Sequence, residues 1–296
     1  MPPADAKAES HPDNTGFSLF HCEAPQSPIL LSVPHAGRDY SPALLEKARV
    51  RPAELVRLED RYADRLVQQA IAHGTSAIIA RHPRAWLDLN RAEKDLDREM
   101  IRGVPADAAY QPSAKTRGGL GLVPRRLSGC GELWKSVHDH AEIEQRLQSF
   151  YRPYHSHIDH ILRQIRDLFG FAILLDIHSM PPLHRQYGWN LAQWVIGDRF
   201  GQSAATDHAE TIRAVLSANR MEVALNHPYP GDHILKMHGD PAHNIHAIQI
   251  EVDRSLYLDE RLREPSPGLS AIGAIINEIV FALAQTAQWP MAEAAE

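Results

Sequence analysis

The sequence has little of what a secreted, membrane-spanning or nucleic-acid-binding protein needs. Its two cysteines, Cys22 and Cys130, form neither a disulfide framework nor a paired metal motif, which favours a reducing compartment. No uninterrupted apolar run reaches the roughly 18 residues of a membrane span, and residues 1–16 lack the apolar core of a signal peptide. The formal charge of -6 is spread along the chain and provides no basic stripe for a phosphate backbone. We therefore expect a cytoplasmic protein without nucleic-acid or membrane partners.

Short apolar runs alternate with segments of helical period, which predicts an α/β fold. We expect a mobile polar tail at residues 1–16, followed by one doubly wound domain over residues 17–290 with a mixed, mostly parallel sheet flanked by helices. The sequence specifies no oligomeric state. Strands are predicted at 28–33, 75–80, 85–89, 171–180, 192–197, 221–225 and 246–252, and helices at 54–73, 134–169 with a break near Pro153, 203–217 and 269–287.

Histidines stand directly after or at the ends of two predicted strands. His35 follows the strand at 28–33, and the apolar run FAILL leads into Asp176, His178 and Ser179. Ligands of open α/β sheets bind at the carboxyl ends of parallel strands. Two histidines and an inward carboxylate would suit a metal hydrolase site. The carboxylate could come from Glu59 or Asp60 within the predicted helix 54–73.

Other polar residues near strand ends have two interpretations each. Asp176 lies on the same side of its strand as His178, so it would either orient that imidazole or bond a backbone amide. Glu251, inside the apolar strand HAIQIEV, would be a general base beside a metal or the partner of Arg254 in an ion pair. Ser179 lacks the G-x-S-x-G elbow, which argues against a serine nucleophile.

Asn90 and Arg91 follow the strand predicted at 85–89, and an arginine beside an amide is suited to gripping a substrate carboxylate. The glycine cluster at 117–121 has neither the dinucleotide spacing nor the P-loop lysine. It lies in a long irregular segment, which predicts a lid or a binding segment for the substrate.

Eight short motifs in order resemble those of the N-formylglutamate amidohydrolase family between about Leu31 and Glu260. They are SVPHAG at 32–37, EDRYADRL at 59–66, LDLNR at 87–91, YRPYH at 151–155, DIHSM at 176–180, IGDRFGQS at 196–203, NHPYPGDHI at 226–234 and IQIEVDRSLYLDE at 248–260. The resemblance implies a phosphorylase/hydrolase-like α/β fold related to zinc carboxypeptidases and aspartoacylases. It also implies one Zn²⁺ per chain and a small-molecule substrate, N-formyl-L-glutamate, from which formate is removed in histidine degradation.

By this resemblance His35 and His178 are metal ligands and Glu251 is the general base. One departure affects the third ligand: the distant relatives use a glutamate three residues after the first histidine, and this chain has Arg38 there. The resemblance then favours Asp60 as the substitute, with Glu59 as the alternative.

The same likeness assigns Asn90 and Arg91 to the α-carboxylate of the substrate. Arg254, Arg185 and Arg199 are candidates for its second carboxylate. Three alternatives remain open: a hydrolase of another N-formyl or N-acyl amino acid, a non-haem Fe(II) oxygenase with a two-histidine, one-carboxylate triad, and a binding module for acidic amino acids without a metal.

Overall fold

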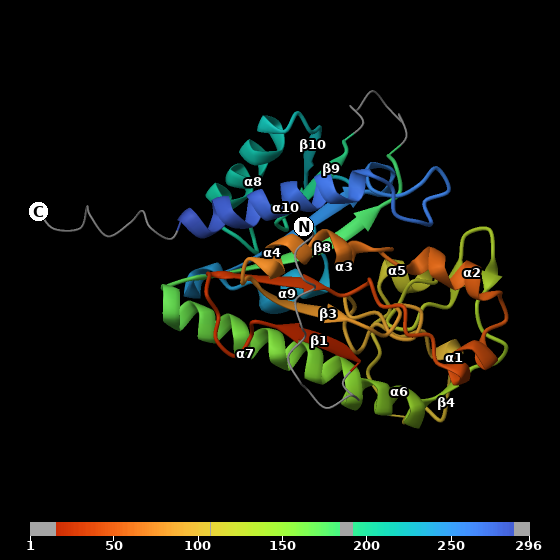
Figure 1. Ribbon diagram of the computed structural model, residues 1–296. Coiled ribbons are helices and arrows are strands. Elements are labelled where there is room, and N and C mark those ends of the chain that lie inside the picture. The colour runs from red at the N-terminus through yellow and green to blue at the C-terminus, as the bar shows by residue number, and fades with distance from the viewer. Residues whose placement is uncertain (1–15, 107, 184–191, 287–296) are drawn as a thin grey trace, which may run out of the picture.

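A seven-stranded mixed sheet runs through the computed structural model (Figure 1). The structure describes residues 16–106, 108–183 and 192–286, so nearly all of the predicted tail and Arg185 lie outside the described residues. The strand order is β1-β3-β2-β8-β11-β9-β10. The strands are β1 Phe17–Phe20, β2 Ile29–Val33, β3 Ser76–Ala80, β8 Ala172–Met180, β9 Trp194–Gly197, β10 Val223–Leu225 and β11 Ile245–Asp253.

The centre of the sheet is parallel. β3, β2, β8 and β11 run in one direction, β1 is antiparallel to β3, and β9 is antiparallel to β11 but parallel to β10. Every residue of β8 and β11 is buried, as expected of parallel strands that helices cover on both sides. The predicted mixed, mostly parallel sheet is confirmed.

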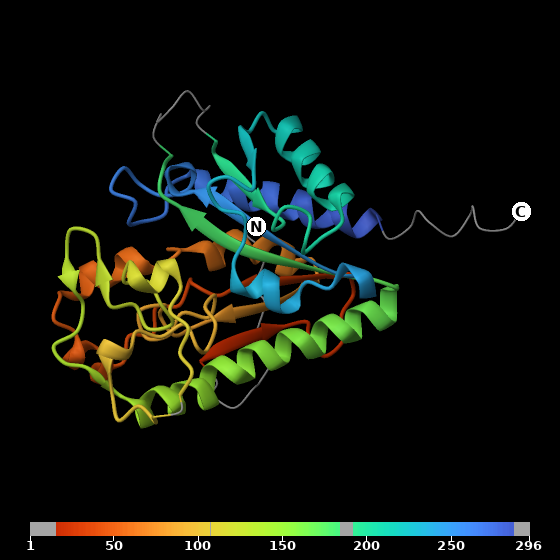
Figure 2. The same ribbon diagram turned by 180° about the vertical axis from the view of Figure 1, so that it is seen from behind.

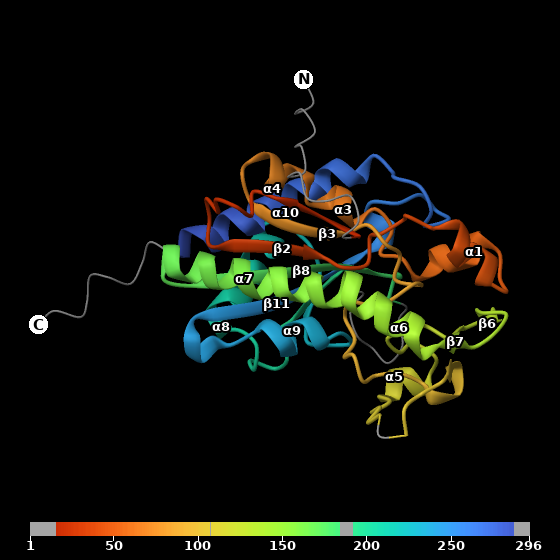
Figure 3. The ribbon, with the colours of Figure 1, turned by 90° about the horizontal axis from the view of Figure 1, so that it is seen from below.

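Two layers of helices cover the sheet. α7 and α9 pack on one face, and α3, α4, α8 and α10 pack on the other. Figure 3 shows α3, α4 and α10 on one side of the central strands and α9 on the opposite side. Leu174 of β8 faces α7, whereas its neighbours Ile173 and Leu175 face α10. The helices are α1 Pro42–Lys47, α2 Pro52–Leu55, α3 Ala63–Leu66, α4 Gln68–Ala72, α5 Ala114–Arg117, α6 His140–Arg146, α7 Arg152–Phe169, α8 Thr206–Ala218, α9 His233–His238 and α10 Gly268–Gln285.

The helix predicted at 54–73 is wrong in its central part. The chain forms α2, a 3₁₀ turn at Val56–Leu58, then α3 and α4, and the backbone N–H of Asp60 donates to the carbonyl of His35 at 3.0 Å. Tyr62 takes a left-handed conformation with φ 59°. A tertiary hydrogen bond therefore pulls residues 59–62 out of the helix and leaves Asp60 on a loop beside the sheet.

Three further predictions need correction. Residues 85–89 form no strand, because Asp88 N–H bonds to Leu122 in an irregular segment rather than to a neighbouring strand. The helix predicted from residue 134 starts at His140, and a π-helical turn, Leu147–Tyr151, joins α6 to α7 before Pro153. The sequence reading did not predict β1 or α9.

Small elements gather at the end of the sheet toward which β8 points. There α1, α2, α5 and α6 lie beside one another with short two-residue strands (Figures 1 and 2). These strands are β4 Ile101–Arg102, β5 Arg126–Leu127, β6 Gly131–Glu132 and β7 His138–Asp139. The long irregular segment predicted to hold a lid therefore builds a wall beyond the strand ends.

Helix α10 is long and apolar enough to cross a membrane by length and composition alone. Its isoleucines Ile272, Ile276 and Ile279 are buried, and the helix packs on α8, α3 and α4. This is the contact pattern of a helix that covers a sheet.

A buried histidine between α8 and β11 makes the stability of the fold pH-dependent. Burial and the neighbouring His208 lower the pKa of His246 from 6.5 to about 4, and its Nδ1 accepts the backbone N–H of Ala205. Because the unfolded chain binds more protons between these two pH values, the free energy of unfolding should fall as the pH is lowered from 6.5 toward 4. His246→Asn keeps an acceptor and should reduce this fall by on the order of 1 kcal/mol.

The measurement is urea unfolding at a series of pH values, with the exposed His243→Asn as control. An unchanged pH slope for His246→Asn would show that His246 does not carry this dependence.

Candidate active site

A pocket of about 540 Å³ lies at the carboxyl ends of β2, β8 and β11. His35, His178 and Glu251 line it together with the loop at residues 228–231. The side chains that line it are richer in cations than in acids, which suits an anionic small molecule. The cations are Arg57, Arg84, Arg91, Lys115 and Arg254, and the acids are Asp60, Asp232 and Glu251.

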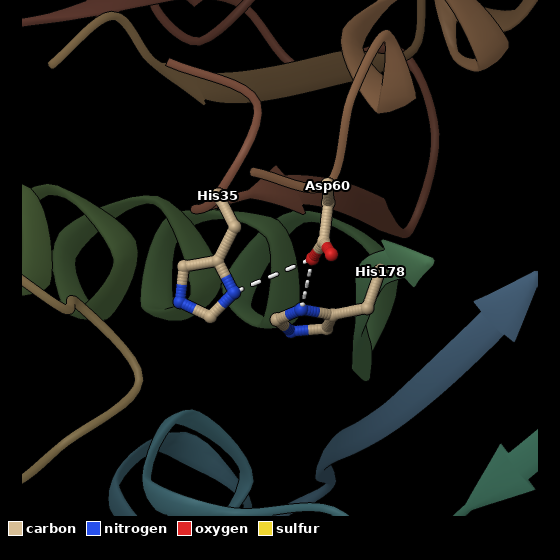
Figure 4. A group of neighbouring side chains, drawn as sticks. All are labelled: His35, Asp60 and His178. Carbon is tan, nitrogen blue, oxygen red and sulfur yellow. Dashed lines mark hydrogen bonds and ion pairs between the residues drawn. The ribbon is translucent and has the colours of Figure 1, made fainter. Parts of the chain in front are cut away.

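Three predicted metal ligands converge in this pocket (Figure 4). Asp60 Oδ2 lies 2.9 Å from His178 Nδ1 and 3.3 Å from His35 Nδ1. His35 comes from the loop after β2, Asp60 from the loop before α3 and His178 from β8 itself. All three are buried, and their potential ligand atoms lie within 4.8 Å of one another. The residues therefore form one cluster of two histidines and one carboxylate.

Two carboxylates outside the cluster orient its histidines, so that both Nδ1 atoms point toward Asp60. His35 Nε2 donates to Asp88 Oδ1 at 2.7 Å, and His178 Nε2 donates to Asp176 Oδ2 at 2.8 Å. In the neutral form that binds a metal, each imidazole has a single N–H, and these bonds would leave both Nδ1 lone pairs directed toward Asp60. Without a metal, His178 Nδ1 carries a proton and donates to Asp60 Oδ2 at 2.9 Å. Within the described residues, buried His35 Nδ1 has no hydrogen-bond partner. Histidines whose other ring nitrogen is bonded to a carboxylate are the usual ligand arrangement of a metal site.

Electrostatics supports this arrangement. Burial alone would raise the pKa of Asp88, but the guanidinium of Arg84 and the ring of His35 hold that pKa well below its usual range. Burial would lower the pKa of His178, yet the carboxylates of Asp176 and Asp60 raise it well above the usual value. The site thus attracts positive charge strongly.

The second carboxylate oxygen of Asp60, Oδ1, is also hydrogen-bonded. Its Oδ1 accepts from Arg254 at 3.0 Å and from Ser179 Oγ at 3.3 Å. Arg254 Nε in turn donates to Ser179 Oγ at 2.9 Å. Ser179 therefore supports the carboxylate, and much of the Arg254 guanidinium is occupied with this task while still lining the pocket.

Glu251 lies beside the cluster. In the parallel pair β8 and β11 its Cα is the register partner of His178, so both side chains project from the same face of the sheet. Gln249 Nε2 donates to Glu251 Oε1 at 3.0 Å, and burial raises the pKa of Glu251 to about 7. Arg254 forms its ion pair with Asp60, at 3.0 Å, and not with Glu251 as the alternative interpretation predicted. A buried carboxyl with this pKa is suited to proton transfer near neutral pH.

Asn90 and Arg91 line the same pocket. Asn90 Nδ2 lies 3.4 Å from His178 Nε2, and its Oδ1 accepts from the backbone of Ile234. Arg91 Nη1 bonds Asp232 at 2.7 Å, and Lys115 bonds the same carboxylate oxygen at 2.6 Å. A carboxylate is thus already seated between two pocket cations on this wall.

The family model of N-formylglutamate amidohydrolase matches residues 27–258 of the chain. The chain belongs to the N-formylglutamate amidohydrolase family. It is similar to the N-formylglutamate deformylases of Pseudomonas putida, at 31% identity over 79% of this chain and 82% of the relative, and of Pseudomonas aeruginosa, at 27% identity over 79% and 83%. The crystal structure of an N-formylglutamate amidohydrolase from Ralstonia eutropha JMP134 has a TM-score of 0.85 at 28% identity, covering 93% of this chain and 99% of that one.

Membership in this family makes the chain a hydrolase that acts on an amide bond, and it confirms the α/β class. Non-haem Fe(II) oxygenases with this triad typically have a β-rich fold, so the α/β fold of this chain argues against that alternative. The cluster itself fits a metal, because its converging atoms are two imidazole nitrogens and one carboxylate oxygen, which are common metal ligands.

The structure bears on the departure at Arg38 and on the choice between Asp60 and Glu59. Arg38, at the position where distant relatives have a metal glutamate, forms a two-bond ion pair with Asp64. Glu59, the alternative third ligand, lies outside the cluster and accepts from Tyr40 and Arg61 instead. The structure therefore brings Asp60, rather than Glu59, together with the histidines.

Of the candidates for a second carboxylate, Arg254 lines the pocket, Arg199 does not, and Arg185 lies outside the described residues. Sequence reasoning missed Asp88 and Arg84, although Asp88 stands in the LDLNR motif. Asp88 could have been found as the second acid needed once Asp176 was assigned to the other histidine. Arg84 carried no sequence signal, because its segment resembled an ordinary loop.

Proposed function

We propose that the protein hydrolyses the formyl amide of N-formyl-L-glutamate, releasing formate and glutamate, with one zinc ion bound by His35, Asp60 and His178. The observation that carries the proposal is the convergence of these three buried ligands beside a buried carboxyl, Glu251, at the strand ends. The named activity of the relatives supports the choice of substrate. A cytoplasmic location and a role in histidine degradation belong to the same proposal.

Glu251 takes the proton from the attacking water and passes it to the leaving amine of glutamate. A bound zinc ion would act as a Lewis acid: it would lower the pKa of the attacking water to about 7 and stabilise the developing oxyanion. Asp88 and Asp176 hold the two imidazoles in the tautomer that keeps Nδ1 free. Arg84 donates to Asp88 and lines the pocket, and its positive charge favours the ionised form of Glu251.

The anionic substrate is held by the cationic wall. Asn90 and Arg91 bind the α-carboxylate, which competes with Asp232 for Arg91. Arg254 lines the pocket and is the described candidate for the side-chain carboxylate, since its bonds to Asp60 and Ser179 use only Nε and Nη2. Arginine suits this role because its planar donors match a carboxylate.

The test is formate release, measured for N-formyl-L-glutamate, N-formyl-L-glutamine, N-formyl-L-aspartate and N-acetyl-L-glutamate. We expect the highest kcat/KM for N-formyl-L-glutamate, loss of activity after zinc is removed by a chelator, and recovery after zinc is added back. Undiminished activity in chelator-treated protein with no bound metal would overturn the zinc proposal, and preference for another acyl group would overturn the substrate.

A further inference from the structure

The motif YRPYH at 151–155 covers the last residue of the π-helical turn and the first turn of α7, and its residues have no role in the proposed chemistry. Tyr151, Tyr154 and His155 are spaced so that they lie on one helix face. All three are buried, with exposed fractions of 2%, 0% and 2%. The π-helical turn Leu147–Tyr151 ends where this face begins, and such turns occur frequently at functional sites.

Tyr154 reaches the metal cluster through two intermediates. Ser32 Oγ donates to Asp176 Oδ1 at 2.8 Å, and Asp176 Oδ2 accepts from His178. Since Ser32 has a single hydroxyl proton, Tyr154 is the donor in its 3.0 Å bond to Ser32. Both oxygens of the buried Asp176 are therefore oriented, one by His178 and the other by a chain that starts on α7.

Tyr151 and His155 reach the substrate-binding loop instead. Tyr151 Oη donates to the backbone carbonyl of Arg91 at 2.7 Å, and His155 Nε2 donates to that of Leu89 at 3.0 Å. His155 Nδ1 then accepts from His238 at 2.9 Å. These bonds clamp the backbone on both sides of Asn90.

The histidine pair that supports this clamp is neutral. Burial and the proximity of His238 hold the pKa of His155 well below its usual value, and burial lowers the pKa of His238 to about 4. A neutral His155 has one donor and one acceptor, and both are used. The clamp therefore has a single hydrogen-bonding arrangement at neutral pH.

We propose that the turn Tyr151–His155 is a positioning element that aligns the metal histidine His178 with the substrate-binding loop at Asn90–Arg91. This inference rests on the proposed function. One helical turn bonds to the supports of both sites, so α7 helps to set the distance between them. The residues touch neither the substrate nor the metal in this assignment.

The two arms can be separated by variants one turn apart. Tyr154→Phe removes the hydroxyl of the metal arm, and zinc affinity should fall by about 3- to 10-fold, somewhat less than the loss typical when a direct partner of a metal ligand is removed. Tyr151→Phe removes the hydroxyl of the substrate arm, so KM for N-formyl-L-glutamate should rise several-fold while zinc affinity stays unchanged. Zinc affinity is measured by competition with a chelator, and KM at saturating zinc.

Tyr110→Phe, at a tyrosine outside the pocket, is the matched control for the loss of a hydroxyl. Ser32→Ala and His155→Leu repeat the two arms by other side chains, so an unfolded variant in either arm does not stop the test. Wild-type zinc affinity in folded Tyr154→Phe and Ser32→Ala, or wild-type KM in folded Tyr151→Phe and His155→Leu, would overturn the inference. Zinc affinity is read without turnover, so a wild-type protein that binds zinc but releases no formate would count against the proposed function alone.

Discussion

Glu251→Gln is expected to lower kcat by about 10³- to 10⁴-fold, the upper range for loss of a general acid–base group, while zinc stays bound at about one ion per chain. Glutamine has nearly the same shape as glutamate and can accept from Gln249, but it cannot take a proton from water. Because Glu251 lies outside the proposed ligand set of His35, Asp60 and His178, we expect that its charge is not needed to keep the metal. Turnover and zinc content are measured on the same preparation.

The pH dependence of the wild-type enzyme should report the same group. Burial raises the pKa of Glu251 to about 7, and the reaction needs its deprotonated form. The value of kcat/KM should therefore fall as the pH is lowered below neutrality, because acid protonates the carboxyl of Glu251. A bound cation lowers the pKa of a nearby carboxyl, so it should move this acidic limb of the profile to lower pH. Residual activity of Glu251→Gln should lack the acidic limb. Loss of zinc together with activity would instead make Glu251 a metal ligand.

Residues that stand at strand ends could be assigned from sequence because the fold class fixes where they meet. His35, His178 and Glu251 each follow or end a buried apolar run, and parallel strands bring such positions to one edge of the sheet. The strand period of two likewise placed Asp176 on the same side as His178, and the structure shows the bond between them. These inferences needed only local patterns and one topological rule.

The residues outside regular structure could not be assigned from local patterns alone. Asp60 appeared to belong to a helix because apolar residues recur with helical period from 55 to 70, yet its N–H bonds the carbonyl of His35. Asp88 pairs with His35 across an irregular segment that was predicted to be a strand. The positions of Asp60 and Asp88 both depend on contacts between residues far apart in the chain, and hydrophobic periodicity carries no information about such contacts. The family resemblance, rather than the pattern, favoured Asp60.

Asp60→Asn is expected to weaken zinc binding by more than about 100-fold, beyond the loss seen when only a partner of a ligand is changed, and to abolish formate release at ordinary zinc concentrations. The amide loses the negative charge that faces both Nδ1 atoms, and it leaves Arg254 without its carboxylate. Zinc affinity is measured by chelator competition, and folding is checked by circular dichroism and Tm. Added zinc should restore part of the activity.

Glu59→Gln is the matched control, because Glu59 is the neighbouring residue, is equally buried and was the alternative third ligand. Its oxygens accept from Tyr40 and Arg61, and neither bond involves the cluster. The glutamine can still accept from Tyr40, so zinc affinity should stay within about threefold of wild type. The opposite result, with tight zinc binding in Asp60→Asn and loss of zinc in Glu59→Gln, would move the third ligand to Glu59. That outcome would require residues 59–61 to rotate on binding metal, breaking the bond between Asp60 N–H and the His35 carbonyl.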